Sequence, residues 1–347
     1  MVNRRRFISN AALGYTFARL GMFNTAKASP PDGSLTNLNA MNYSDSKSFD
    51  NIKQINAGVL NVGYAEAGSV NGQVVILLHG WPYDIHSYAE VAAILASKGY
   101  KVIVPYVRGY GTTRFLSDSE IRNGQQSVFA RDIIDLMDAL KIKNAIIGGF
   151  DWGARTANII AALWPDRCSA LVSVSGYLIG SQQANKAPLP PKAEQAWWYQ
   201  YYFATERGEM GYKQNTYEFN KLIWQTASPQ WHFDEATYKL SAQSFNNSDH
   251  VAIVINNYRW RLGLIKGETK YDDFEKELAM APIISVPTIT LEGDANGAPH
   301  PDPTAYAGKF KGRYLHRTVS GGIGHNLPQE APLEFAHAII EAAGYAE

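Results

Sequence analysis

Short apolar runs that alternate with longer amphipathic stretches restrict the fold of this chain more than any other feature. The runs occupy residues 74–78, 101–104, 145–148 and 170–174. Runs of this length are typical of strands buried on both faces of a parallel sheet. The stretches between them have apolar side chains at helical spacing, at 86–97, 125–140 and 154–164. This alternation predicts an α/β fold with a mostly parallel, doubly wound sheet and helices on both faces.

The alternation breaks in the middle of the chain. From residue 177 to 280 no buried-strand run occurs, and the sequence is aromatic, helical in spacing and interrupted by Pro and Gly. Strands resume at 288–291 and 314–317, before a last helix at 331–343. We therefore predict a core formed by 51–176 and 281–347, with a helical cap, 177–280, inserted over the ligand-binding end of the sheet. Loose alternation over 55–67 predicts two antiparallel strands at the start of the core.

Composition excludes several classes of protein. Of the 347 residues, 46% are hydrophobic and 18% charged, which is ordinary for a globular enzyme. The 32 basic and 32 acidic residues cancel, so a nucleic-acid partner is not expected. No apolar run reaches the roughly 18 residues of a membrane span. Cys168 is the single cysteine, which rules out an internal disulfide and a cysteine-clustered zinc site, and we expect it to be a packing residue.

The N-terminus resembles an export signal. Arg4, Arg5 and Arg6 precede a moderately apolar stretch, and Ala26-Lys27-Ala28 supplies small residues for cleavage. We predict a twin-arginine signal over 1–28, a linker or N-terminal arm over 29–50, and a periplasmic or secreted protein. Because Arg19 interrupts the apolar stretch, a cytoplasmic enzyme with a basic N-terminus is the alternative.

A glycine-flanked aspartate marks the candidate nucleophile. Gly149-Phe150-Asp151-Trp152-Gly153 lies between a predicted buried strand and a predicted helix. The pattern is that of the nucleophile elbow, G-x-S-x-G, with Asp in place of Ser. Such a turn presents the central side chain at a helix N-terminus, where the helix dipole favours a carboxylate. By itself the pattern also fits an aspartate that merely caps a helix.

Two further residues favour the interpretation of Asp151 as a nucleophile over that of a residue that merely caps a helix. Asp294 follows the resumed strand, and His325 lies in a glycine-rich loop between the last strand and the last helix. Folds that contain a nucleophile elbow place the nucleophile, the acid and the base in this order along the chain. We therefore expect Asp151 to be the nucleophile, His325 the base and Asp294 the acid that orients it. Glu292 is the rival acid, less favoured because it lies nearer the strand.

The loop after the strand at 74–78 completes the site. The elbow fold builds its oxyanion hole from the amide after the nucleophile and an amide in this loop. His79-Gly80-Trp81-Pro82 occupies the loop, so the expected donors are the backbone N–H groups of Trp81 and Trp152.

Together these motifs carry a family resemblance. His79-Gly80-Trp81-Pro82, Arg108-Gly109-Tyr110-Gly111 and the Asp151 elbow resemble motifs of α/β-hydrolase epoxide hydrolases and the related haloalkane dehalogenases. The resemblance extends from about residue 52 to the end. It departs at Trp81, where epoxide hydrolases usually have Phe, and at Phe150, where His is common.

The resemblance also implies ring-opening groups in the cap. In epoxide hydrolases two cap tyrosines donate to the epoxide oxygen, and the matching segments here place them at Tyr199 and Tyr258. Phenols suit the role because they donate a hydrogen bond without ionising at neutral pH. Tyr201 and Tyr202 are fallback candidates.

An aspartate nucleophile favours attack on an sp³ carbon, because the resulting alkyl ester can be hydrolysed by activated water. We predict an epoxide hydrolase that acts on a small apolar epoxide with water and needs no cofactor or metal. A haloalkane dehalogenase with the same Asp–His–Asp set is the alternative, with Trp152 and one of Trp197, Trp198 or Trp224 as halide donors. A non-catalytic binding protein of this fold is a third option. Nothing in the sequence decides whether the protein forms a homodimer.

Overall fold

The computed structural model describes residues 48–49 and 51–345. The predicted export signal lies outside them, as does the predicted linker apart from residues 48 and 49. Among the described residues, a single nine-stranded sheet runs in the order β1-β2-β4-β3-β6-β7-β8-β9, and β5 pairs with β2 beside this path. The strands are β1 (Ile52–Ala57), β2 (Leu60–Gly68), β3 (Val74–Leu78), β4 (Lys101–Pro105), β5 (Arg114–Phe115), β6 (Ala145–Gly149), β7 (Cys168–Val174), β8 (Thr288–Gly293) and β9 (Tyr314–Val319).

The sheet is mostly parallel, as the sequence predicts. All neighbouring pairs from β4 through β9 are parallel, whereas β2 is antiparallel to β1, β4 and β5. The described helices are α1 (Ala89–Ser97), α2 (Gln126–Ala139), α3 (Trp152–Leu163), α4 (Pro191–Ala196), α5 (Trp198–Ala204), α6 (Glu206–Gln214), α7 (Thr216–Ala227), α8 (Glu235–Ala242), α9 (His250–Arg261), α10 (Asp272–Ala279), α11 (Pro303–Tyr306), α12 (Leu327–Glu330) and α13 (Pro332–Ala343).

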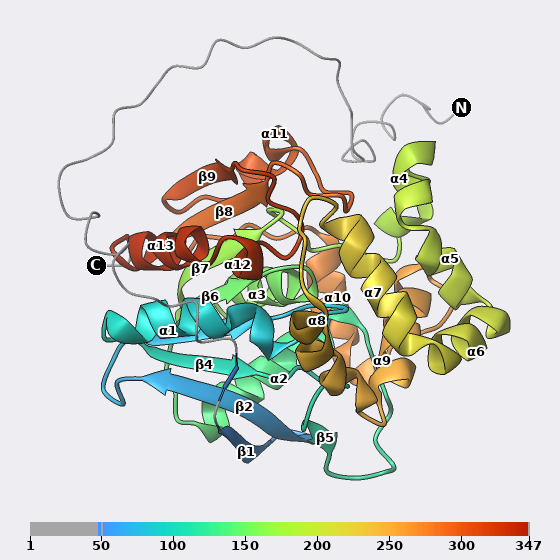
Figure 1. Cartoon of the computed structure of the whole chain (residues 1–347), viewed down its shortest axis with the longest axis horizontal. Helices are drawn as coiled ribbons and strands as arrows, with labels where there is room; N and C mark the ends of the chain where they lie inside the picture. Colours follow the sequence, from blue (N-terminus) through green and yellow to red (C-terminus); the bar gives the residue numbers. More distant parts are fainter. Residues whose placement is uncertain (1–47, 50, 346–347) are drawn as a thin grey trace, which may run out of the picture.

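The continuous apolar runs are explained by a sheet that is covered on both faces. Successive strand residues point to opposite faces. Val75 and Leu77 of β3 join the hydrophobic cluster that contains residues of α1 and α13. Ile76 and Leu78 join the cluster that contains residues of α2 and α3. Figure 1 shows the sheet between these helices. The α/β prediction is confirmed.

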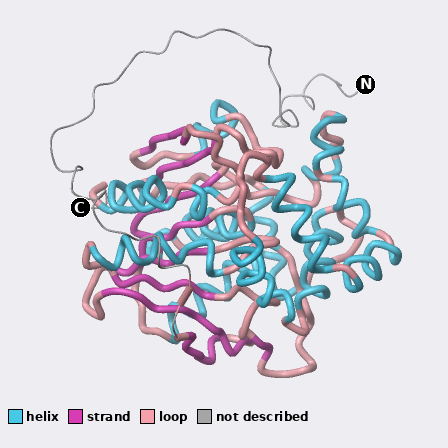
Figure 2. Tube along the Cα trace, viewed as in Figure 1, coloured by secondary structure: helices cyan, strands magenta, loops and turns pink. Residues whose placement is uncertain are grey.

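Seven helices, α4 to α10, lie in the long connection between β7 and β8. Figure 1 shows α4 to α9 gathered beside the sheet, and Figure 2 shows this helical region next to the strand-rich half of the molecule. The region is tied to the core by direct bonds. The indole Nε1 of Trp224 on α7 donates to the carbonyl of Pro82 at 2.7 Å, and the side-chain amide of Asn247 donates to the carbonyl of Thr113 at 2.7 Å.

Candidate active site

Asp151 lies on a strained turn between β6 and α3. Its backbone has φ 53° and ψ −125°, a region that non-glycine residues rarely occupy. The turn packs tightly against the end of β3. A Cβ on Gly153 would lie 1.8 Å from the carbonyl oxygen of Leu78, and a Cβ on Gly80 would lie 2.3 Å from Oδ1 of Asp151. The glycines thus allow two loops to meet at the carboxylate.

The two carboxylate oxygens of Asp151 have different surroundings. Oδ1 accepts a hydrogen bond from the backbone N–H of Trp81 at 2.8 Å, and the Trp152 amide also bonds to the carboxylate. Oδ2 lies 3.3 Å from Nε2 of His325. Burial alone would raise the pKa of Asp151, but the His325 ring and the Trp152 amide outweigh it and lower the pKa below its ordinary value. The group is therefore a carboxylate at neutral pH.

The Asp151 side chain remains reachable although its neighbours are buried. It is 22% exposed, whereas Phe150 and Trp152 are 0% and 2% exposed. The Trp81 amide holds Oδ1, which leaves Oδ2 available for attack. The amides expected to form an oxyanion hole, those of Trp81 and Trp152, are the groups that contact it.

His325 lies in the loop between β9 and α12, and it is 8% exposed. Its backbone N–H donates to the Ser228 hydroxyl at 2.9 Å. Nε2 faces Asp151, but the buried Nδ1 has no hydrogen-bond partner among the described residues. The structure thus brings together the predicted nucleophile and base, and no acid in residues 48–49 and 51–345 hydrogen-bonds to Nδ1 on the far side of the ring.

Among the described residues, Asp294, predicted to orient His325, makes no hydrogen bond to its ring. Oδ2 of Asp294 accepts the amide of Gly321 at 3.0 Å, and Oδ1 accepts the amides of Gly322 and Ile323, both at 2.9 Å. Gly321 and Gly322 have φ of 118° and 82°, which turns their amides towards the carboxylate. These bonds lower the pKa of Asp294. Asp294 therefore braces the loop that carries His325 through the main-chain amides of that loop.

The rival acid, Glu292, is also engaged elsewhere. Its Oε1 accepts the side-chain amide of Asn296 at 2.7 Å, and its Oε2 lies 4.0 Å from Nε2 of His300. Neither carboxylate considered from the sequence satisfies Nδ1 of His325.

The cap contributes the two predicted tyrosines. Tyr199 on α5 and Tyr258 on α9 have ring centroids 5.4 Å apart, and their side chains are hydrogen-bonded. Each also packs against Trp81, with centroid distances of 5.0 and 5.2 Å. Burial raises the pKa of both phenols, and the negative charge of Asp151 raises it further. Both groups therefore stay protonated near neutral pH and lie within electrostatic reach of the carboxylate.

The fallback tyrosines are occupied with other contacts. Tyr201 is 48% exposed and donates its hydroxyl to Glu194. Tyr202 stacks on Phe219 with a centroid distance of 6.1 Å.

A buried polar network behind Trp81 could not be foreseen from the sequence. The indole Nε1 of Trp81 donates to the Tyr212 hydroxyl at 2.9 Å, which lies 2.9 Å from Nε2 of His250. Nδ1 of His250 lies 3.0 Å from the carbonyl of Gly109. A carbonyl only accepts, so Nδ1 carries the proton. The Tyr212 hydroxyl has one proton, for which Nε2 of His250 and Oδ1 of Asn220, at 3.0 Å, compete. Burial lowers the pKa of His250 to about 3, which keeps the ring neutral. No local motif marks Tyr212 or His250.

The predicted halide donors differ in availability. The buried Nε1 of Trp152 has no partner among the described residues. By contrast, Nε1 of Trp224 donates to the Pro82 carbonyl. Trp198 is 40% exposed.

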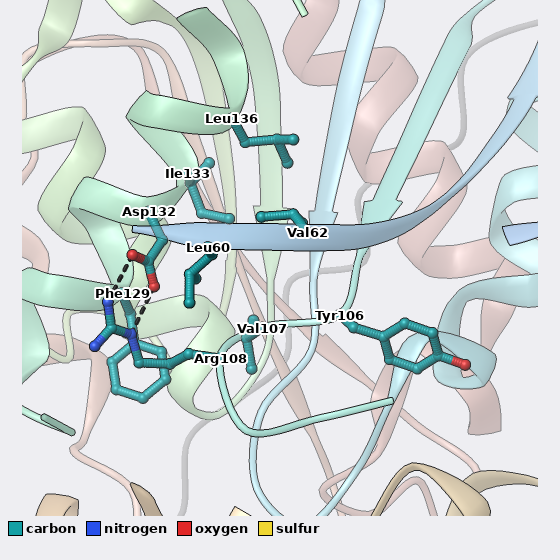
Figure 3. A pocket seen from close by; sticks show the side chains of 9 residues that line it. All are labelled: Leu60, Val62, Tyr106, Val107, Arg108, Phe129, Asp132, Ile133 and Leu136. Carbon is teal, nitrogen blue, oxygen red and sulfur yellow. Dashed lines mark hydrogen bonds and ion pairs between the residues drawn. The ribbon is translucent and has the colours of Figure 1, made fainter. Parts of the chain in front are cut away.

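The Arg108 motif supports the core at some distance from the nucleophile. Nε and Nη2 of Arg108 donate to the two oxygens of Asp132, both at 2.6 Å, and Nη1 donates to the carbonyl of Asn123 at 2.8 Å. Figure 3 shows the pair beside a void of about 10 Å³ that neither Asp151 nor His325 lines. Such a void holds at most one water molecule. We therefore interpret the pair as structural.

Metal sites and membrane spans are both absent from the described residues. No group of three or more His, Cys, Asp or Glu side chains in residues 48–49 and 51–345 could hold a metal ion. Over the same residues, no helix combines the length and apolarity needed to cross a membrane.

Comparison with known proteins identifies the family. The α/β hydrolase fold family matches residues 73–251, just over half of the chain. The chain belongs to the α/β hydrolase family. A crystal structure from Klebsiella pneumoniae, described as that of a candidate epoxide hydrolase, is 63% identical to this α/β hydrolase. It has a TM-score of 0.85, and the match covers 86% of this chain and 99% of that one.

Curated relatives of this α/β hydrolase carry the same name over shorter matches. An epoxide hydrolase of Caballeronia sordidicola is 36% identical over 30% of this chain and 31% of its own length. Epoxide hydrolase B of Mycobacterium tuberculosis is 30% identical over 40% of this chain and 41% of its own length. The chain thus spans less than half of either relative. A potato epoxide hydrolase structure, 19% identical with a TM-score of 0.66 over 84% of this chain and 98% of that one, shares the fold.

Proposed function

We propose that this protein hydrolyses a small apolar epoxide to a vicinal diol through an alkyl ester on Asp151. Its relatives named epoxide hydrolase support the reaction class. The observation that carries the proposal is the pairing of a carboxylate with two protonated phenols. Backbone amides donate to the carboxylate of Asp151, and its negative charge raises the pKa of both Tyr199 and Tyr258.

In the first half-reaction Oδ2 of Asp151 attacks the less hindered epoxide carbon. The new C–O bond forms as the bond from that carbon to the ring oxygen breaks. Tyr199 and Tyr258 donate hydrogen bonds to the leaving oxygen, which takes a proton from one of them. Oδ1, held by the Trp81 amide, becomes the carbonyl oxygen of the ester, and the Trp152 amide also bonds to the carboxylate.

In the second half-reaction His325 takes a proton from water, and the resulting hydroxide attacks the carboxyl carbon of Asp151. The same two amides stabilise the tetrahedral oxyanion. Collapse expels the diol oxygen, which takes back the proton held by His325. Asp151 is left as a carboxylic acid with one oxygen from water, and its proton passes to the phenolate, which regenerates the carboxylate.

Isotope labelling tests this sequence. In a single turnover in H₂¹⁸O with excess enzyme and styrene oxide, we expect an unlabelled diol and one ¹⁸O in the peptide that contains Asp151. An H325Q variant should accumulate a protein adduct with the mass of the substrate. Label in the diol during the first turnover, without an adduct in H325Q, would show direct attack by water and refute the ester mechanism.

Dehalogenation is the second candidate, and the unpartnered indole N–H of Trp152 beside the nucleophile favours it. A departing halide is usually held by two donors. However, Trp81 donates its indole N–H to Tyr212 and Trp224 donates its own to Pro82. Assays with 1-bromobutane and 1,2-dibromoethane separate the reactions. Halide release without turnover of any epoxide would replace the first proposal. Absence of turnover and of any adduct with either class would favour a non-catalytic binding protein.

We also propose that residues 1–28 direct export through the twin-arginine route. The motif Arg4-Arg5-Arg6 and the small residues before Ser29 support this proposal. Fractionation of a host that expresses the full chain should recover mature protein, cleaved after Ala28, in the periplasm. Replacing Arg5 and Arg6 by Lys should retain it in the cytoplasm.

A further inference from the structure

The structure leaves His325 without the carboxylate that its chemistry requires. A histidine base becomes an imidazolium during the reaction, and a buried acid usually stabilises this cation and fixes the ring. Here Nδ1 is buried without a partner among the described residues, and Asp294 is bound to three loop amides. Another group has to hold His325 in place and supply negative charge near it.

Glu330, at the end of α12, is attached to the chain on both sides of His325. Its Oε2 accepts the backbone N–H of Gly324 at 2.7 Å. Its Oε1 accepts the backbone N–H of Asn326 at 3.1 Å and the Ser228 hydroxyl at 2.7 Å. One half-buried carboxylate therefore holds the residues immediately before and after the base.

Ser228 completes the attachment from the cap side, where it follows α7. Its Oγ lies 2.9 Å from the backbone nitrogen of His325 and 3.3 Å from that of Asn326. The hydroxyl has one proton, and Glu330 only accepts, so Ser228 donates to Glu330 and accepts from both amides. Ser228 and Glu330 together satisfy three consecutive backbone N–H groups.

The close fit at Gly324 shows that this arrangement is built into the packing. A Cβ on Gly324 would lie 2.5 Å from both Cα and Oγ of Ser228. No side chain larger than hydrogen fits there unless Ser228 moves. The loop that carries the base thus packs tightly against the end of α7. Glu330 bonds to both residues of this contact, Gly324 and Ser228.

The charge of Glu330 also acts on the base. Burial raises the pKa of Glu330, while the hydrogen bonds from Ser228 and Gly324 and the charge of His325 offset some of this rise. The coupling between Glu330 and His325 is reciprocal. Glu330 therefore places a carboxylate within electrostatic reach of His325.

We propose that Glu330, acting with Ser228, is the positioning residue for His325 in the hydrolytic half-reaction, in place of the acid after β8. The proposal rests on the function proposed above. It predicts that the pair governs hydrolysis of the ester and leaves formation of the ester to Asp151 and the two tyrosines. It also links the base to the cap, because Ser228 follows a cap helix.

Single-turnover kinetics can separate the two half-reactions. Purified full-length wild type, E330Q, E330D, S228A and D294N are mixed in excess with styrene oxide, quenched, and analysed for ester by intact mass and for diol by chromatography. For E330Q we expect ester formation within about twofold of wild type and ester hydrolysis about 10–100-fold slower, so that the adduct accumulates. S228A should shift the same step in the same direction. E330D, which retains the charge, should recover some of the lost hydrolysis rate.

E334Q on α13 is the matched control, because it neutralises a nearby carboxylate that makes none of these bonds; its two rates should equal those of wild type. Unchanged hydrolysis in both E330Q and S228A would overturn the proposal, as would selective slowing in D294N alone. An equal fall in both rates would reduce Glu330 to a structural role. If E330Q does not fold, the rate of ester hydrolysis in S228A tests the proposal instead. Absence of any ester in wild type and in H325Q would refute the proposed function itself, and the role of Glu330 with it.

Discussion

Asp151 and His325 lie on loops of the hydrolase core, whereas Tyr199 and Tyr258 lie on cap helices α5 and α9. The core pair is positioned by backbone. Amides hold the carboxylate of Asp151, and hydrogen bonds to main-chain N–H groups fix the loop of His325. Each of these bonds joins a main-chain N–H group to the side chain of Asp151, Glu330 or Ser228, so it depends on the turns of the chain and on these three residues.

The cap pair is positioned by side chains. Tyr199 and Tyr258 are fixed by each other and by the Trp81 ring, and Phe203 packs 6.1 and 5.4 Å from their centroids. Aromatic contacts of this kind each contribute about 0.5–1.5 kcal/mol and tolerate small displacements. We infer that the core holds the positions of Asp151 and His325 within narrow limits, while the positions of the two cap tyrosines can adjust to the substrate. Four predictions test this contrast.

The largest effect is expected at the nucleophile. D151N removes the attacking charge and should lower kcat/KM by about 10⁴-fold or more, without loss of fold, because Asn tolerates positive φ. Initial rates of diol formation and a far-ultraviolet circular dichroism spectrum measure the two properties. D166N, at an exposed position before β7, is the control. Activity above about a hundredth of wild type would mean that Asp151 is not the nucleophile.

The double variant Y199F/Y258F comes next. Without a proton donor for the alkoxide, ester formation should slow by about 10²–10⁴-fold, and each single variant should lose less. Rapid-quench measurement of the adduct isolates this step. Y201F alters an exposed hydroxyl and should leave the rate unchanged. Full activity of the double variant would assign ring opening to other groups and remove the cap from the chemistry.

A smaller effect is expected behind Trp81, where core and cap meet. Y212F deletes the hydroxyl between the Trp81 indole and His250, leaving buried polar groups unpaired. Urea unfolding should show a loss of about 1–3 kcal/mol. Ester formation should slow by about tenfold or less, since the Trp81 amide remains in place. An unchanged midpoint would show that water replaces the hydroxyl and that the contact is not rigid.

The smallest effect is expected from pH on ester formation. The pKa of Asp151 is lowered, so its carboxylate persists as pH falls to about 5, and the pKa values of both phenols are raised, so they keep their protons up to about pH 9. The single-turnover rate of adduct formation should therefore be flat between these limits. A rise of tenfold or more across this range would show that one of the three groups titrates within it.

The same contrast explains what could be predicted from the sequence. The strands and the Asp151 elbow were accessible because buried runs and glycine-flanked turns are local patterns with a physical cause. Tyr199 and Tyr258 followed only from a family resemblance, because tyrosines are common here and helical spacing does not show which of them share a face with the nucleophile.

The residues that hold the loop of His325 could not be predicted, for a different reason. Chain order places Asp294 near the base, but the conformation of Gly321 and Gly322 determines where its carboxylate points. Ser228 and Glu330 lie 102 positions apart in sequence and meet only in the folded chain. A serine at the end of a helix and a glutamate within a helix are both common, so no sequence pattern distinguishes Ser228 and Glu330 in advance.

The backbone conformation of Asp151 has a consequence for the stability of the whole protein. A non-glycine residue at such φ and ψ costs about 1–3 kcal/mol, which the rest of the fold must offset. Glycine would adopt the same turn without that penalty. The inactive D151G variant should therefore melt at a higher temperature than the active protein, and selection for thermal tolerance alone would discard the nucleophile. At this one position, the fold and the reaction favour different amino acids.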